Sequence, residues 1–296
     1  MDNRTEIRDF LVSRRGRVTP EQAEQAGLVA CGRNRRVSGL RREEVALLAG
    51  ISIEYYTRLE RGHASGVSED VLEAIVRALQ LDEAERAHLF DLVRAANTTR
   101  APRRRPPQDR VRPMVQRILD AMSDVPAYVR NGRLDILSAN RLGTALYSEL
   151  FAEPVRPANM ARFIFLNPRA GDFFADWPGI ANDAVAILRA EAGRDPYDRR
   201  LSDLVGELST RSEDFRVRWA AHDVKLACTY VKTLHHPIVG DLTLAYESLH
   251  LPNDPGQRIL VYTAEPGSKT HEALNLLASW TTTANPAAET VSEHPS

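Results

Sequence analysis

The sequence predicts two domains: an N-terminal all-α bundle of five helices and a C-terminal α+β domain with an antiparallel five-stranded sheet. Three features carry this prediction. Apolar residues recur at helical spacing through 1–96, a proline- and arginine-rich linker without apolar periodicity fills 97–112, and strand-like alternation with turn signals follows in 113–266. We expect residues 267–296 to form a terminal helix and a disordered tail.

Three helices of the first domain are marked by their faces and caps. One covers residues 5–14. A second begins at Ser68, an N-cap followed by two acidic residues, and a third begins at Asp82, which forms a capping box with Glu85. Their expected inward side chains are Ile7, Phe10, Leu11, Val71, Leu72, Ile75, Leu79, Phe90 and Val93.

Residues 45–62 predict two more helices joined by a tight turn. Gly50 supplies the turn, because glycine adopts positive φ without strain. Ser52 can cap the second helix, Ile51 and Tyr56 are spaced for a hydrophobic staple, and the last glycine of the range ends the helix. This is the geometry of a helix-turn-helix, which makes DNA the first candidate partner.

The helix pair has an inward and an outward face. The inward residues are Val45, Leu48, Ile51, Tyr56 and Leu59. The outward residues are Ile53, Glu54, Tyr55, Thr57 and Arg58. An isoleucine and a tyrosine gain nothing by facing water, so their expected exposure favours contact with a partner.

Residues 42–62 resemble the lambda-repressor/Cro-like helix-turn-helix family. The resemblance implies that the second helix enters the major groove of DNA. Arg58 would then bind guanine through two hydrogen bonds, and Glu54 would accept a bond from cytosine. Ile53 or Tyr55 would contact a thymine methyl group. The complete set of expected DNA contacts is Arg41, Arg42, Ser52, Ile53, Glu54, Tyr55, Thr57, Arg58 and Arg61.

Arg41 departs from the family pattern, which often has serine or threonine at this position. The capping box of the first helix is therefore only half present, in Glu44, although Arg41 adds positive charge and Arg42 stands at the groove rim. Thr57 is expected to contact phosphate or sugar. The alternative interpretation is an amphipathic helix pair in an ordinary all-α core.

The net charge differs between the two halves of the chain. The whole chain carries a net charge of −1 and has a pI near 6.7. Residues 1–112 contain 21 arginines and 17 acidic residues, which gives +4, whereas the remainder contains 18 basic and 23 acidic residues, which gives −5. Arginines that can neutralise phosphates gather before the helix pair and in the linker. They are Arg33, Arg35, Arg36, Arg41, Arg42, Arg103, Arg104 and Arg105.

Cysteine usage and hydropathy indicate a cytoplasmic protein. Cys31 and Cys228 lie in different expected domains, so no structural disulfide is expected, which fits a reducing compartment. No apolar run approaches the roughly 20 residues that span a bilayer. The N-terminus has no signal-peptide pattern, and we expect no membrane contact.

The C-terminal domain mixes helices and strands. Helices are expected at 114–122, with Ile118, Leu119 and Met122 inward, and at 140–150 and 183–191. Strands are expected at 127–137, a hairpin turning at Asn131 and Gly132, at 215–219 with Phe215, Val217 and Trp219 inward, at 230–234, at a partner strand bearing Leu242, Leu244 and Tyr246, and at 258–263.

This order of elements resembles a PAS-type sensor fold. From Glu6 to about Ser279 the chain resembles the MmyB-like transcription regulators, on the segments 167–177, 221–224, 236–240 and 264–267. The resemblance implies a helix-turn-helix joined to a domain that binds a small apolar molecule, such as a fatty acid.

Aromatic residues of the C-terminal domain are the expected lining of a ligand pocket. They are Phe163, Phe165, Phe173, Phe174, Trp177 and Trp219. The expected polar groups are Asn140, Arg162, His222 and His236, of which Arg162 can pair with a carboxylate. The alternative is that these aromatic residues form the ordinary core beneath the sheet.

Metal binding and catalysis are not expected. The candidate metal ligands are His222, Cys228, His235, His236 and His250. Adjacent histidines on a strand point to opposite faces, and no paired-cysteine or His-x-x-x-His spacing accompanies them. His222 beside Asp223 lacks a nucleophile, and no phosphate-binding or dinucleotide-binding loop occurs. We expect neither a metal nor a cofactor.

Three hypotheses about function differ in what the C-terminal domain does. It senses a hydrophobic ligand and biases DNA binding, or it only dimerises a constitutive DNA-binding protein, or it is an enzyme that the helix-turn-helix docks on DNA. The first two imply a homodimer, because two-fold regulators read paired half-sites.

Overall fold

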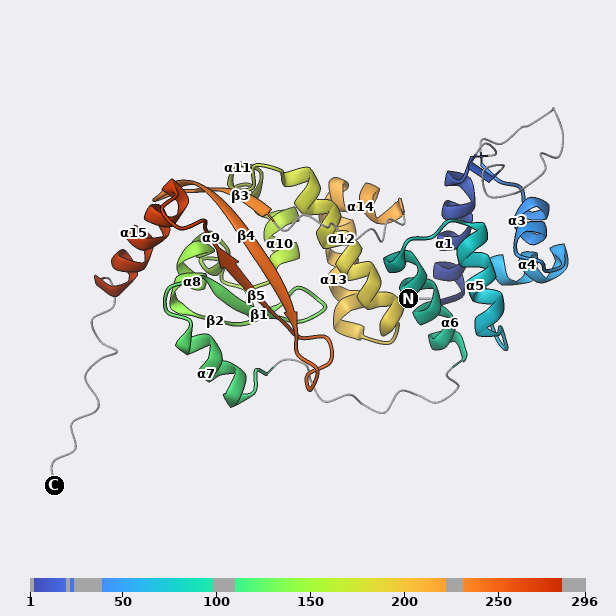
Figure 1. Ribbon diagram of the computed structural model, residues 1–296, viewed down its shortest axis with the longest axis horizontal. Helices are drawn as coiled ribbons and strands as arrows, with labels where there is room; N and C mark the ends of the chain where they lie inside the picture. The colour runs from blue at the N-terminus through green and yellow to red at the C-terminus, as the bar shows by residue number, and fades with distance from the viewer. Residues whose placement is uncertain (1–2, 20–21, 24–38, 98–109, 222–230, 284–296) are drawn as a thin grey trace, which may run out of the picture. The chain divides into compact units, whose positions relative to one another are not determined.

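The computed structural model describes residues 3–19, 22–23, 39–97, 110–221 and 231–283 (Figure 1). It divides into two compact units, Met1–Arg104 with Val185–Leu226 and Arg105–Ala184 with Ala227–Ser296. The expected fold class, a helical bundle and a five-stranded antiparallel sheet with helices, is confirmed. The expectations that lie outside the described residues concern Cys31, Arg33, Arg35, Arg36, Arg103, Arg104, Arg105, His222, Asp223, Cys228 and the tail from 284.

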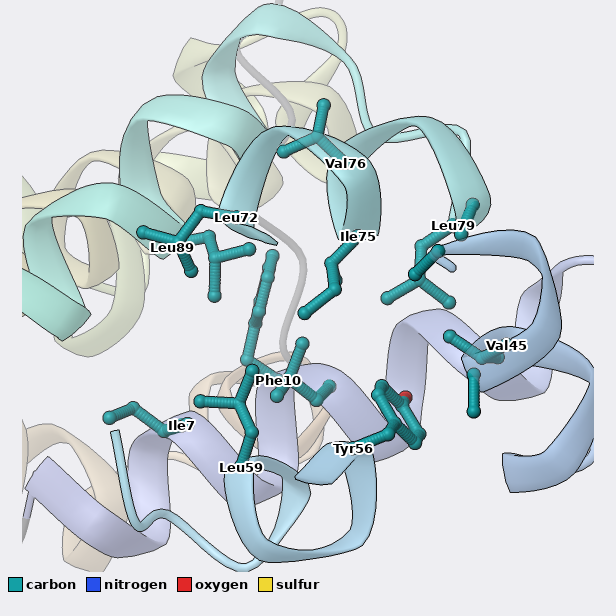
Figure 2. Close-up of a cluster of buried hydrophobic side chains, with 14 of the residues drawn as sticks. Ile7, Phe10, Val45, Tyr56, Leu59, Leu72, Ile75, Val76, Leu79 and Leu89 are labelled. Atoms are coloured by element: carbon teal, nitrogen blue, oxygen red, sulfur yellow. The ribbon is translucent and has the colours of Figure 1, made fainter. Parts of the chain in front are cut away.

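A helical bundle forms the main part of the first unit. Its helices are α1 (Asn3–Arg17), α3 (Arg42–Leu48), α4 (Ile53–Glu60), α5 (Glu69–Ala78) and α6 (Glu83–Asn97). Figure 2 shows the core between them, where Phe10, Tyr56, Leu59 and Ile75 have no more than 1 % of their surface exposed. Burying one such side chain stabilises the fold by about 1.5–3 kcal/mol.

The expected helix caps are confirmed. The Oγ of Ser52 accepts a hydrogen bond from the N–H three residues on at 3.1 Å, and the Oγ of Ser68 does the same at 3.4 Å. Asp82 and Glu85 exchange side-chain to backbone bonds of 2.9 and 3.1 Å. Such caps satisfy N–H groups that the helix leaves unpaired, each contributing about 1 kcal/mol.

The first unit contains three more helical segments. They are the part of α12 (Trp177–Arg194) that begins at Val185, α13 (Arg199–Arg211) and α14 (Glu213–Ala220). The sequence did not indicate this grouping, because the helices are separated from the bundle by the first part of the other unit.

The strand expected at 215–219 is wrong, because this segment forms α14. Ser212 is an N-cap whose Oγ accepts from the Phe215 N–H at 3.2 Å, and two acidic residues follow it in the first turn. Phe215 and Trp219 are four residues apart and therefore share a helix face, where their rings stack at 5.5 Å. Val217 is 58 % exposed instead of inward.

A five-stranded antiparallel sheet forms the centre of the second unit. Its strands are β1 (Ala127–Arg130), β2 (Ile136–Ala139), β3 (Val231–His236), β4 (Gly240–His250) and β5 (Arg258–Thr263), in the order β2-β1-β5-β4-β3. Its helices are α7 (Pro113–Ala121), α8 (Arg141–Leu146), α9 (Ser148–Phe151), α10 (Met160–Leu166), α11 (Ala170–Phe173) and α15 (Lys269–Thr283). This strand order, with helices inserted between β2 and β3, agrees with the expected PAS-type sheet.

Two local expectations for the second unit are corrected. Ile118 is 43 % exposed, because α7 packs on the sheet through the narrower stripe of Val115 and Leu119. The β1–β2 hairpin is confirmed, but its connection covers 131–135 and its positive φ, 66°, falls at Leu134. The buried Asn131 side chain organises this longer loop, since its Oδ1 accepts two backbone N–H bonds of 3.0 Å.

Gly62 ends α4 where two backbone segments meet. Its φ is +84°, and a Cβ at this position would lie 2.4 Å from the Arg4 carbonyl oxygen. We therefore expect Gly62→Ala to lower the free energy of unfolding by at least about 2 kcal/mol, measured by denaturant titration followed by circular dichroism.

Gly66→Ala is the matched control for this substitution. Gly66 also has a positive φ, +75°, but an added Cβ would meet nothing within 4 Å. It should cost only about 1 kcal/mol of backbone strain. Equal losses in the two variants would show that the contact with α1 does not constrain the end of α4.

Candidate nucleic-acid interface

α4 presents both polar and apolar side chains to solvent. Ile53 is 41 % exposed, Glu54 and Arg58 are exposed beside it, and Tyr55 and Thr57 are half-buried. The Arg58 guanidinium lies 5.3 Å from the centroid of the Tyr55 ring, a cation–π contact that orients its donors. The outward face expected for this helix is therefore the one that the fold leaves uncovered by its own core.

This surface extends beyond the end of α4. A concavity is lined by Ile53, Glu54, Thr57, Arg58, Arg61, His63 and Ser65, which we call the α4 surface. His63 and Ser65 were not predicted from the sequence. The signal for them was Gly62, whose positive φ turns the chain so that the next residues run back beside the helix. Ser52 is also exposed, at the cap of α4.

Two arginines stand where α3 begins. Glu44 accepts a bond from the Arg41 N–H at 2.6 Å, which is the half capping box expected from the sequence. The Arg41 guanidinium lies 3.3 Å from a Glu43 oxygen. Arg42 is partly exposed, and Glu60 binds its Nε. Carboxylates thus fix both arginines at the start of α3.

Glu60 is the buried carboxylate of the bundle. It is 1 % exposed and binds Arg15 of α1 through Nε at 2.6 Å as well as Arg42 of α3. The Tyr56 hydroxyl lies 3.5 Å from the same carboxylate and donates to it. Burial, followed by the Glu60 charge, raises the pKa of Tyr56, so this hydroxyl stays neutral. This role of Glu60 was not predicted, because ion-pair partners distant in sequence leave no local pattern.

The aromatic residues expected to line a pocket meet only in part. Phe163, Phe173 and Phe174 are buried and make edge-to-face contacts with centroid distances of 5.0 to 6.0 Å. Phe165 and Trp177 form a separate pair at 6.1 Å. The six expected aromatics therefore do not form one cluster, and Trp219 lies outside it on α14, in the other unit.

Three tyrosines contact the phenylalanine cluster. They were not among the aromatic residues expected there. Tyr147 lies 5.9 Å from Phe173, and the hydroxyls of Tyr128 and Tyr147 lie 3.3 and 2.9 Å from that of Tyr262. Burial raises the pKa of all three hydroxyls, so each is a neutral donor and acceptor. The result is a phenylalanine and tyrosine layer against the sheet, with its polar atoms linked to one another.

Two of the expected polar groups are used inside the fold. Asn140 caps α8: its Oδ1 accepts two N–H bonds, and its Nδ2 donates to two carbonyl groups. His236 is buried, donates from Nε2 to the Ala145 carbonyl and accepts at Nδ1 from two backbone N–H groups. Burial lowers its pKa, in agreement with a neutral ring. Arg162 is half-buried in the first turn of α10.

Lys232 adds a cationic group that the sequence reasoning missed. Its Nζ lies 4.5 Å from the centroid of Tyr246, whose ring is 5.6 Å from that of Tyr262. Burial lowers the pKa of Lys232 to about 8 and raises that of Asp183 to about 6, and the charge of each group opposes the shift of the other. Lys232 is thus connected to the tyrosine layer through Tyr246. It was not predicted because a lysine on a strand usually indicates only a solvated face.

Among the residues that the structure describes, no group of three or more His, Cys, Asp or Glu side chains is arranged to hold a metal ion. The helices in this part of the chain are all too short or too polar to span a bilayer.

The capped helix pair and its exposed outward face define a helix-turn-helix protein with a second, PAS-like unit. Residues 10–89 match the helix-turn-helix domain family, and residues 111–277 match the MmyB-like transcription regulator ligand binding domain. The chain therefore belongs to the MmyB-like transcription regulators, a DNA-binding family with a ligand-sensing domain. Both matched families are regulatory domains and not enzymes. No curated protein matches the chain significantly.

The Glu60 network should contribute strongly to stability. Removing the carboxylate leaves the buried Tyr56 hydroxyl and the Arg15 guanidinium without their acceptor, so we expect Glu60→Ala to lower the free energy of unfolding by about 1.5–3 kcal/mol. The measurement is denaturant unfolding of the full chain. Glu43→Ala removes a carboxylate from the exposed pair with Arg41 and should cost about 1 kcal/mol or less. A loss that is as small for Glu60 would contradict its role.

Proposed function

We propose that this chain is a sequence-specific transcription regulator whose α4 surface reads base edges in the major groove. The observation that carries the proposal is the exposure of Ile53 beside Glu54 and Arg58 on a helix fixed at both ends. An α-helix fits the major groove, and these side-chain types match the groups displayed there.

The chemistry of each side chain suggests its contact on DNA. Arg58 donates two hydrogen bonds to guanine O6 and N7, Glu54 accepts from cytosine N4, and Ile53 packs on a thymine methyl group. Arg42 and Arg61 supply positive charge at the edges of this face, where they neutralise phosphates and make the affinity fall with added salt.

Arg58→Ala tests the proposed contact with guanine. The variant should bind the selected operator more weakly by about 1–3 kcal/mol and lose preference at one base pair, because one bidentate contact disappears. The measurement is a binding titration on genomic fragments captured by the wild-type protein and on single-base variants of them. Arg94→Ala removes an exposed arginine from α6, outside the α4 surface, and is the matched control. An equal loss on every sequence would mean that Arg58 contacts only phosphate.

For the second unit we propose a hydrophobic ligand with an anionic head, such as a fatty acid. The buried phenylalanine and tyrosine layer supports an apolar chain, and Lys232, linked to it through Tyr246, supports a carboxylate. Since the rings of Phe163 and Phe173 pack against each other, an entering chain must part them. Binding is therefore coupled to a conformational change, which is what a sensor requires.

Lys232→Met tests the ligand class. Palmitate should raise the melting temperature of the wild-type protein more than hexadecanol does, and the variant should lose that difference. Because burial lowers the pKa of Lys232 to about 8, the preference for palmitate should be present below this pH and fade above it. Lys269→Met, at the exposed start of α15, is the control. Equal shifts with both lipids would exclude a carboxylate contact at Lys232.

A second candidate function is a constitutive regulator whose C-terminal domain serves only dimerisation. Leu276 and Trp280 favour it, because they lie four residues apart on α15 and are 66 % and 54 % exposed. We propose that the protein acts in the cytoplasm as a homodimer in either case. The lipid titration separates the two functions, since a domain that only dimerises is not stabilised by either lipid.

A further inference from the structure

Arg189 of α12 is bound inside the first unit. It is 1 % exposed, and its Nη1 donates to the Glu6 carboxylate of α1 at 3.0 Å. The guanidinium lies 4.2 Å from the centroid of the Trp219 ring and also donates to the Trp219 carbonyl. A buried charge is stable only when its partners are in place, so this arginine ties α12 to α1 and α14 at once.

A second contact lies one helical turn farther along α12. A Cβ added at Gly193 would come within 2.7 Å of the His88 imidazole of α6. His88 is itself buried and meets the Phe10 ring edge-on at 5.1 Å. The missing side chain at Gly193 therefore allows α12 to approach α6 closely, beside the core of the bundle.

The α1 helix that receives Arg189 also contacts the C-terminal end of α4 at two points. Arg4, two residues before Glu6, lies against Gly62 at the end of α4. Arg15 near the other end of α1 binds Glu60. A displacement of α1 would therefore act directly on the position of α4.

We propose that the C-terminal part of α12 is a docking element of the DNA-binding bundle, latched by the Glu6–Arg189 ion pair, through which the ligand-binding domain changes DNA affinity. Residues 177–194 all fall within the matched ligand-binding domain, yet α12 is divided between the units, with its start in the second and its end in the first. The inference rests on the proposed function and specifies how the two activities are joined. Coupling needs two arrangements that both sites can favour. Here they are α12 bound to the bundle with the Glu6–Arg189 pair formed, and α12 released with the pair broken.

Hydrogen exchange of the full chain tests the latch. Arg189→Met should speed the exchange of α1 and α6 amides by at least about tenfold, because the bundle loses its docked helix. Arg211→Met removes an arginine from an exposed pair on α13 and should leave both helices unchanged. If Arg189→Met fails to fold, Glu6→Gln breaks the same pair from the other side and should speed the exchange of 185–194. If the amides of α1, α6 and 185–194 exchange at the wild-type rate in Arg189→Met and Glu6→Gln, the ion pair does not hold α12 on the bundle.

Operator DNA tests the coupling separately. Coupling of binding equilibria is reciprocal, so DNA bound at α4 must change the exchange of 185–194 in the wild-type protein and not in Arg189→Met. Protection of α4 in the same experiment reports DNA binding itself. Protection of α4 without any change in 185–194 would overturn the coupling while leaving the proposed function intact. No protection of α4 would count against the proposed function alone.

Discussion

The position of α4 depends on the carboxylate of Glu60. This group is almost completely buried and is held by Arg15 from α1, Arg42 from α3 and the Tyr56 hydroxyl from α4 itself. A buried charge tolerates little displacement, because each lost hydrogen bond leaves it unsatisfied in a medium of low polarity. The three helices are therefore fixed to one another at the C-terminal end of α4, and Arg42 is fixed beside it. An interface with DNA needs such a rigid support, since base contacts are lost by displacements of about 1 Å.

The second unit places its polar atoms differently. The hydroxyls of Tyr128, Tyr147 and Tyr262 satisfy one another inside an aromatic layer, so they stabilise a closed core without a charge. Arg133 and Asp135 are buried as an ion pair of 3.0 Å, and burial disfavours the ionised forms of Lys232 and Asp183. Both units thus contain a buried ion pair, and the second adds a tyrosine layer whose hydroxyls bind one another.

The sequence was sufficient where structure is decided locally. The caps at Ser52, Ser68 and Asp82 and the outward face of α4 were predicted, because each depends on residues within one or two turns. The prediction for 215–219 failed because its apolar spacing fits both a strand and a helix. Residues four apart share a helix face, and the N-cap at Ser212 stabilises the helix. The Glu60 network, the tyrosine layer and the docking of α12 join residues far apart in the chain, which local patterns do not record.

We have proposed that the α4 surface enters the major groove of DNA. Dimethyl sulfate footprinting of the operator tests it most directly, since this reagent methylates guanine N7 in the major groove and adenine N3 in the minor groove. We predict that the bound protein protects guanine N7 within each half-site and leaves adenine N3 reactive there, because Arg58 occupies the guanine edge. Protection confined to adenine N3, with guanine N7 fully reactive, would contradict the account.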